Sequence, residues 1–114
     1  MLRVPKKLRP PTPGEVLLKD YLEPLRISQL AFAERIGVTP ARLNEIIKGK
    51  RSITPDTALR LERVLGTSTG SWLNMQLVLD LYDARHLAYA KDYARLRPLI
   101  KVRRARETPI AAHA

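Results

Sequence analysis

A short segment of the chain concentrates the side chains best suited to recognising nucleic acid. Arg42 offers a bidentate donor that matches guanine, and the amide of Asn44 could pair with adenine or hold a phosphate. Glu45 could accept from a cytosine amino group, or could instead pair with Arg42 or Lys48. The small side chain of Ala41 could touch a thymine methyl group. Taken singly, each could equally be an ordinary solvated helix residue, so their meaning depends on the elements that position them.

Those elements are two short helices joined by a tight turn. The pattern predicts a helix from Ser28 to about Ile36, which ends at Gly37 because glycine readily adopts the left-handed conformation. Thr39 then caps a second helix, and Pro40 takes its first position. Positions that must be small or apolar for close crossing and core anchoring are Ala33, Val38, Leu43 and Ile46. This spacing is typical of a helix-turn-helix, whose second helix enters the major groove of DNA.

Flanking residues are candidates for contacts with the phosphate backbone. Ser28 and Gln29 lie at the start of the first helix, where backbone amides and the helix dipole favour an anion. Lys48, Lys50 and Arg51 form a cationic edge after the second helix. Ser28 also serves as a helix cap, whatever else it contacts. The complete set of predicted DNA-contacting residues is Ser28, Gln29, Thr39, Pro40, Ala41, Arg42, Asn44, Glu45, Lys48, Lys50 and Arg51.

Charge and composition narrow the class of protein. The chain has 114 residues and a net charge of +10, and the excess lies mainly at its two ends. Basic ends favour a polyanion such as nucleic acid, or are solvated tails that only raise solubility. The sequence contains no cysteine, which suits a reducing compartment. It also shows no secretory signal pattern and no apolar run long enough for a membrane span, so we expect a cytoplasmic protein.

The chain divides into a basic, proline-rich arm (residues 1–11), a helical DNA-binding domain (residues 12–94) and a basic, flexible tail (residues 95–114). We expect an all-α fold, because apolar residues recur at helical spacing between cap and glycine signals. The five predicted helices cover residues 12–23, 28–36, 39–48, 54–65 and 71–94. The first should end before Pro24, which cannot continue the backbone hydrogen bonding of a helix.

The last predicted helix is longer than the others, and its apolar surface is wide. One small bundle need not cover that surface, so part of it could face a second copy of the chain. The predicted dimer interface consists of Trp72, Leu73, Leu77 and Leu81, with packing inside the monomer core as the alternative.

Residues for catalysis or metal binding are not evident. The two histidines are His86 and His113, and only Asp83 lies within a helical turn of the first. A metal site needs further ligands, and none is suggested nearby. We therefore predict that the chain is not an enzyme and carries no metal or cofactor.

Longer runs of sequence resemble a known family. Residues 10–82 resemble the HigA-type (VapI-like) antitoxins, a branch of the λ-repressor-like (XRE) helix-turn-helix family. The matching text includes Pro13-Gly14-Glu15, the run from Asn44 to Arg51 and the run from Trp72 to Gln76. One departure is that the family usually has a histidine between the threonine and the Pro-Gly-Glu, whereas Thr12 here directly precedes Pro13.

The resemblance implies a five-helix λ-repressor-like domain and a role in a type II toxin–antitoxin module. A member of the family neutralises a HigB-like (RelE-like) ribonuclease toxin, forms a homodimer and represses its own operon at an inverted-repeat operator. Two alternatives remain at this point. One is a stand-alone XRE-type repressor without a toxin, and the other is a protein–protein adaptor that no longer binds DNA.

Overall fold

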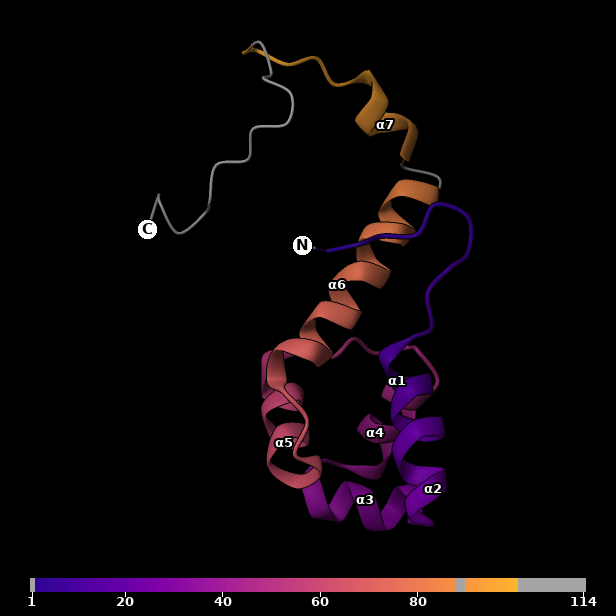
Figure 1. Cartoon of the computed structure of the whole chain (residues 1–114), viewed down its shortest axis with the longest axis vertical. Helices are drawn as coiled ribbons and strands as arrows, with labels where there is room; N and C mark the ends of the chain where they lie inside the picture. The colour runs from indigo at the N-terminus through magenta and orange to yellow at the C-terminus, as the bar shows by residue number, and fades with distance from the viewer. Residues whose placement is uncertain (1, 88–89, 101–114) are drawn as a thin grey trace.

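The computed structural model describes residues 2–87 and 90–100, and all of the regular structure in these ranges is helical. Short helices form a bundle, from which one long helix projects (Figure 1). In chain order the helices are α1 (Pro13–Val16), η1 (Leu17–Leu22), α2 (Glu23–Leu25), α3 (Gln29–Ile36), α4 (Pro40–Ile47), α5 (Pro55–Leu65), α6 (Thr69–His86) and α7 (Ala90–Arg95). The predicted all-α fold is confirmed. Within the described ranges, no helix is both long and apolar enough to span a membrane.

The first helix runs continuously through α1, η1 and α2, so the prediction that it ends before Pro24 is wrong. The η1 stretch is π-helical, and the backbone N–H of Glu23 donates to the carbonyl of Leu18, five residues earlier. A wider turn gives the ring of Pro24 room beside the carbonyl four residues before it, where an α-helix would bring a clash. The helix ends at Arg26, which adopts a left-handed conformation with φ of 55°.

A single apolar core holds the bundle together, and Trp72 belongs to it. The Trp72 side chain is 1% exposed, its Nε1 donates to Thr67 Oγ1 at 2.6 Å, and its ring lies 5.8 Å from that of Tyr21. The predicted place of Trp72 in a dimer interface is therefore wrong, because its indole is enclosed by its own monomer. The core residues are Leu17, Leu22, Phe32, Ala33, Ile36, Leu43, Ile46, Ile47, Ile53, Ala58, Leu61 and Trp72.

Helix α6 is shorter than the sequence predicts. It begins at Thr69 and ends at His86, and Leu87 is extended, so the single helix expected over residues 71–94 is divided into α6 and α7. Residues 88 and 89 lie outside the described ranges. Residues 85–87 are exposed, so the bundle gives no packing support to a further turn, and helices of this kind depend on such support.

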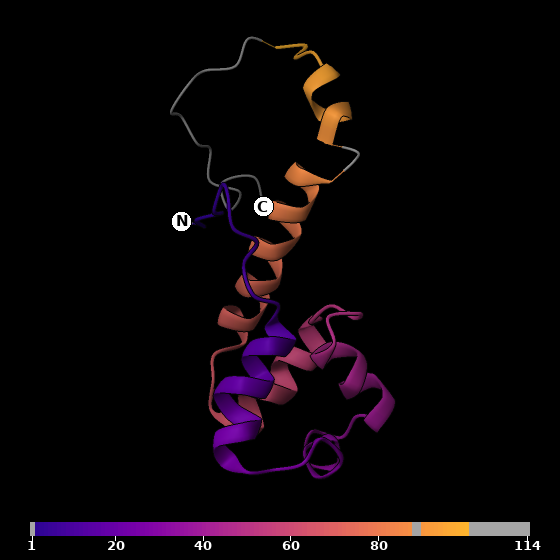
Figure 2. The same cartoon turned by 90° about the vertical axis from the view of Figure 1, so that its right-hand side faces the viewer.

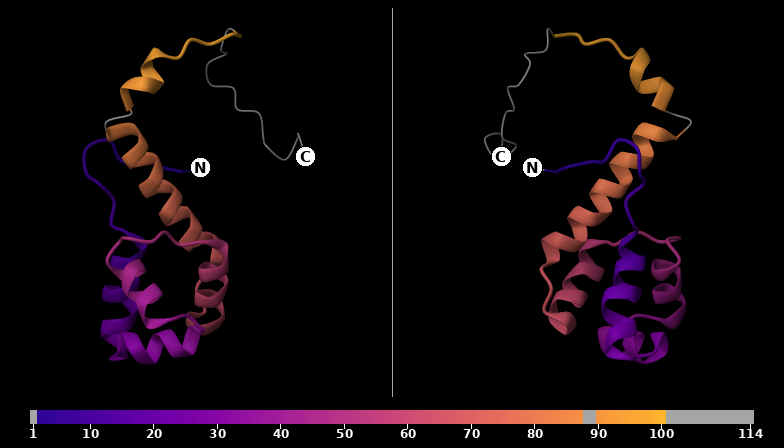
Figure 3. Two further views of the ribbon diagram at one scale, coloured as in Figure 1. Left: turned by 180° about the vertical axis from the view of Figure 1, so that it is seen from behind. Right: turned by 45° about the vertical axis from the view of Figure 1, so that its right-hand side comes forward.

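The N-terminal arm runs beside α6, as Figures 2 and 3 show. Tyr82 Oη donates to the carbonyl of Lys7 at 3.1 Å, and His86 Nε2 lies 2.9 Å from the carbonyl oxygen of Lys6. Arg9 pairs with both carboxylate oxygens of Asp83, at 2.9 and 3.0 Å. We refer to these contacts as the arm clasp. They fix the course of the extended arm along the last two turns of α6.

Candidate nucleic-acid interface

Helices α3 and α4 form the predicted helix-turn-helix. The hydroxyl of Ser28 accepts a backbone N–H from the first turn of α3, and the hydroxyl of Thr39 does the same for α4, both at 3.1 Å. Gly37 ends α3 with φ of 73°, and Pro40 is the first residue of α4. Ala33 is fully buried, as close packing between the two helices requires. Each of these local signals was therefore interpreted correctly from the sequence.

One side of α4 is anchored in the core and the other is exposed. Leu43 and Ile46 are at most 1% exposed, whereas Pro40, Ala41 and Lys48 are exposed to solvent. The first three residues of α4 therefore contribute no buried side chain to the core. This is the arrangement that lets a recognition helix present its N-terminal end to base edges.

Two of the predicted contact residues touch each other. Asn44 Nδ2 donates to Gln29 Oε1 at 3.1 Å, and both side chains are half-buried. This hydrogen bond connects α4 to the start of α3. It uses the carbonyl oxygen of the Gln29 amide and leaves its NH₂ group as a donor for a phosphate. Asn44 thus supports Gln29 in the structure, an arrangement that the sequence did not predict.

Glu45 pairs with Arg51, not with Arg42 or Lys48 as the sequence suggested. Arg51 Nε and Nη2 lie 3.1 and 3.0 Å from Glu45 Oε1. Both side chains are about half exposed, so the pair contributes only about 0–1 kcal/mol to stability. Lys48 and Lys50, the other two cations of this edge, are exposed and form no ion pair with any described residue.

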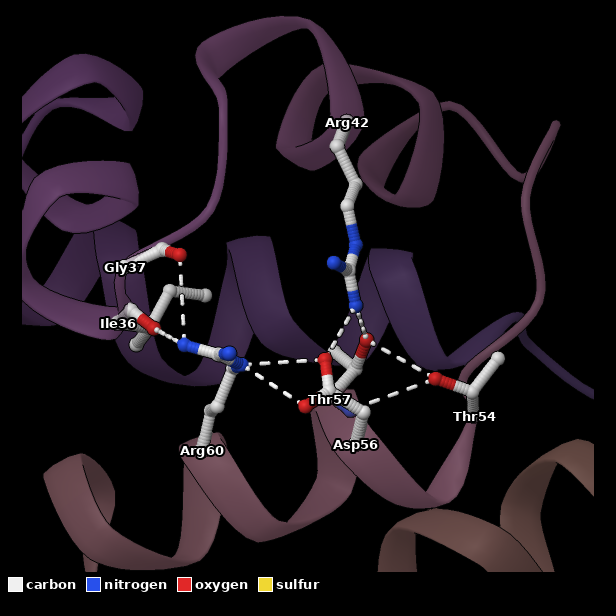
Figure 4. Close-up of polar contacts among 7 residues, drawn as sticks. All are labelled: Ile36, Gly37, Arg42, Thr54, Asp56, Thr57 and Arg60. Carbon is white, nitrogen blue, oxygen red and sulfur yellow. Dashed lines mark hydrogen bonds and ion pairs between the residues drawn. The ribbon is translucent and has the colours of Figure 1, made fainter.

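Arg42 points from α4 toward the start of α5 (Figure 4). Its Nη2 donates to Asp56 Oδ2 at 2.8 Å and to Thr57 Oγ1 at 2.7 Å, and its side chain is 28% exposed. Asp56 is a residue that the sequence analysis missed as part of the site. Its place in the first turn of α5 after Thr54 and Pro55 marks a helix start, and that local role gives no indication of a partner in α4.

Asp56 also binds a second arginine. Arg60 Nε lies 3.1 Å from both Asp56 carboxylate oxygens, and Arg60 Nη1 donates to the carbonyl of Ile36 at 2.9 Å. Hydrogen bonds from Arg42, and secondarily from Arg60, hold the pKa of the Asp56 carboxyl below its ordinary value. The carboxylate is therefore ionised at neutral pH. We refer to Arg42, Asp56, Thr57 and Arg60 as the Asp56 network.

Helix α6 holds the remaining predicted site residues. Leu77 is 44% exposed and Leu81 is half-buried, whereas Leu73 is half-buried and packs against the core. A shallow apolar hollow lies on the same helix, lined by Pro10, Pro11, Ser71, Asn74, Met75 and Val78. We call Leu77, Leu81 and the lining residues of this hollow the outer α6 face.

The structure brings together no metal-binding cluster within the described ranges. No group of three or more His, Cys, Asp or Glu side chains there could hold an ion. His86 belongs to the arm clasp, and His113 lies outside the described residues, as does most of the predicted basic tail.

Several known proteins are similar in sequence to this chain. The family described as helix-turn-helix matches residues 18–72. The chain is 36% identical over 93 residues to antitoxin HigA-1 of Vibrio cholerae, covering 82% of this chain and 87% of that protein. It is 51% identical over 69 residues to virulence-associated protein I of Dichelobacter nodosus, covering 60% of this chain and 64% of that relative, slightly less than two thirds of its length.

Solved structures share the fold. The Pseudomonas aeruginosa antitoxin HigA with higBA promoter aligns with a TM-score of 0.74 at 34% identity, covering 81% of this chain and all of that one. Antitoxin GraA in complex with its operator aligns with a TM-score of 0.75 at 28% identity, covering 87% of this chain and all of that one. By sequence and by fold, the chain belongs to the HigA-type antitoxin family of helix-turn-helix proteins.

Proposed function

We propose that this protein is the antitoxin of a type II toxin–antitoxin module and that it represses its own operon as a homodimer bound to a palindromic operator. The observation that carries the proposal is α4, which is anchored on one side by Leu43 and Ile46 and exposes Pro40 and Ala41 at its N-terminal end. A helix held in this way can enter the major groove without loss of core packing.

Phosphate contacts would come from residues that flank α4. The N-terminus of α3 offers free backbone N–H groups beside Ser28 and Gln29, and the latter is held by Asn44. Lys48 and Lys50 supply exposed positive charge beyond the end of α4. These groups bind backbone rather than bases, so they set affinity and its dependence on salt.

A dimer is proposed because one recognition helix covers only a half-site. Two copies about one helical turn of DNA apart would read an inverted repeat. The outer α6 face is the apolar surface that we assign to the second copy, and Leu77 is its most exposed leucine. Trp72 is excluded from this interface by its burial.

A toxin partner is proposed from family membership, because several similar proteins are described as antitoxins. The expected partner is a HigB-like (RelE-like) ribonuclease. Other relatives are described as HTH-type transcriptional regulators, including Escherichia coli YbaQ at 36% identity, which favours a stand-alone repressor as the second candidate. A small toxin gene beside this one would distinguish the two.

The test has two parts, one for each activity. Fluorescence anisotropy should show that the protein binds its own promoter fragment far more tightly than a fragment with a scrambled inverted repeat, and that affinity falls steeply with salt. Equal affinity for the two fragments at low and moderate salt contradicts operator binding. Co-expression with the neighbouring gene should relieve growth arrest caused by that gene alone, and failure to relieve it leaves the stand-alone repressor.

A further inference from the structure

We propose that Asp56 and Arg60 are positioning residues for DNA binding. In this proposal Arg42 holds the N-terminal end of the recognition helix against α5 instead of reading guanine. This inference rests on the proposed operator binding. In Figure 4 the Asp56 carboxylate lies between the two arginines, one from α4 and one from α5. It connects the N-terminal end of α4 with the turn that precedes that helix.

The hydrogen bonds of Arg42 occupy the nitrogen that both bidentate edges of its guanidinium share. A guanidinium presents two parallel N–H pairs, one formed by Nε and Nη2 and the other by Nη1 and Nη2. The nitrogen that belongs to both pairs, Nη2, already donates to two acceptors, Asp56 Oδ2 and Thr57 Oγ1. Recognition of guanine needs one complete pair, so Arg42 would have to release Asp56 or Thr57 in order to form it.

Arg60 connects the Asp56 carboxylate to the turn between the two helices of the helix-turn-helix. Its Nη1 donates to the carbonyls of Ile36 and Gly37, at 2.9 and 3.3 Å, where α3 ends and its carbonyls have no helical partner. A positive group at that end also complements the helix dipole. A Cβ atom on Gly37 would lie 2.9 Å from Arg60 Nη1. The absence of a side chain at Gly37 therefore leaves space for the guanidinium and also permits the left-handed φ of 73°.

Local packing explains why the N-terminal end of the recognition helix needs support from a neighbouring helix. The first side chain of α4 that enters the core is Leu43, and the helix begins with two exposed residues, Pro40 and Ala41. Arg42, which lies between them and Leu43, contacts α5. Exposed ion pairs of this kind add little to stability, so their effect is expected in the orientation of the helix end that meets DNA.

The direction in which Asp56→Asn changes operator affinity distinguishes a positioning role from a simple effect of net charge. Removing an acid near a DNA-binding surface should tighten binding if only charge matters, because the protein becomes more positive. A positioning role predicts the opposite for the operator, a weakening of about tenfold, which is the scale of a lost charge-assisted hydrogen bond. Affinity for non-specific DNA should not fall. Asp20→Asn, at an exposed aspartate outside the network, is the matched control and should leave operator affinity unchanged.

A double-mutant cycle completes the experiment. Operator affinity is measured for wild type, Arg42→Gln, Asp56→Asn and the double variant, together with operators substituted one base at a time. We expect each single change to weaken binding about tenfold, the double change to weaken it no further, and the order of preference among bases to be kept. Arg60→Gln should act in the same direction. Urea unfolding of each variant should show a smaller coupling than operator binding does.

Three results would overturn the inference. If Asp56→Asn binds the operator as tightly as wild type or more tightly, while Arg42→Gln loses its preference at one base pair, Arg42 is a base reader and Asp56 does not position it. If wild type itself does not distinguish operator from scrambled DNA, the proposed function fails and the inference fails with it. Operator binding by wild type with no coupling between Arg42 and Asp56 overturns the inference alone.

Discussion

At the scale of single residues, Gly14 shows how closely the first helix approaches the recognition helix. A Cβ atom on Gly14 would lie 1.9 Å from the backbone oxygen of Ile46 and 2.7 Å from the Cα of Ile47. Both neighbours are backbone atoms of α4, so no side-chain rotation can relieve the clash. The missing side chain at Gly14 therefore sets the distance between α1 and the recognition helix.

We predict that Gly14→Ala destabilises the protein by about 3 kcal/mol, since overpacking against backbone forces whole helices apart. Urea unfolding followed by circular dichroism measures the change. The control is Gly70→Ala in the first turn of α6, where a Cβ would meet nothing within 4 Å. That change should be neutral or should stabilise by up to about 1 kcal/mol, because alanine favours helix. Equal effects of the two substitutions would contradict the packing explanation.

At the scale of elements, the arm clasp joins the N-terminus to the last two turns of α6. The backbone carbonyls of Lys6 and Lys7 contact the α6 side chains, which leaves the lysine ammonium groups exposed. Arg9 provides the ion pair, and its hydrogen bonds hold the pKa of the Asp83 carboxyl below its ordinary value. Docking of the arm therefore depends on a charge that acid removes.

We predict that Asp83→Asn loosens the arm, because Arg9 loses its ionised partner. Limited trypsin digestion at neutral pH, read by mass spectrometry, should show cleavage after Lys7 faster by about two- to fivefold, the range of an exposed ion pair. Cleavage after Arg3, which lies outside the clasp, should keep its rate. An unchanged rate after Lys7 would show that the two carbonyl contacts suffice.

The ion pair should also respond to pH in one direction. A carboxyl whose pKa is lowered by a partner stabilises docking above its unfolded pKa, and this contribution is lost as pH falls through the lowered value. The NMR signal of Arg9 Nε should therefore keep its paired position through neutral and mildly acidic pH. It should move toward its position in Asp83→Asn only below about pH 3.9, the ordinary value for aspartate. A transition near neutral pH would assign the change to another group.

At the scale of the whole molecule, α6 projects from the bundle and leaves an apolar face uncovered. Its inner side holds Trp72 and Leu79, which are at most 5% exposed, while Leu77 on the outer α6 face is 44% exposed. An exposed apolar strip beside a hollow is a common mark of a protein–protein contact. The proposed homodimer would cover it and would space two α4 helices for an inverted repeat.

We predict that Leu77→Asp yields monomers that bind the operator poorly, because a buried carboxylate in the interface would lack a partner. Light scattering measures the mass, and anisotropy measures operator affinity. Leu59→Asp is the control, since Leu59 is 53% exposed, lies on α5 and is not part of the outer α6 face. A Leu77→Asp variant that stays dimeric would place the interface elsewhere.

Much of the fold could be predicted because helix ends are local signals. Ser28, Gly37 and Thr39 act within three or four residues of their own positions, so the helices α3 and α4 and the turn between them could be located without knowledge of the tertiary structure. Pro24 misled the prediction, because the π-helical widening that accommodates it is not encoded by any local cap.

The sequence by itself determined the helix-turn-helix and the family, since both rest on spacing within short segments. Tertiary structure decided the partners of the long polar side chains and the side of α6 that is buried. Arg42 meets Asp56 14 positions away, and Arg9 meets Asp83 74 positions away. A guanidinium has several possible acceptors on any surface, and only the packing of helices determines which one lies within hydrogen-bonding distance.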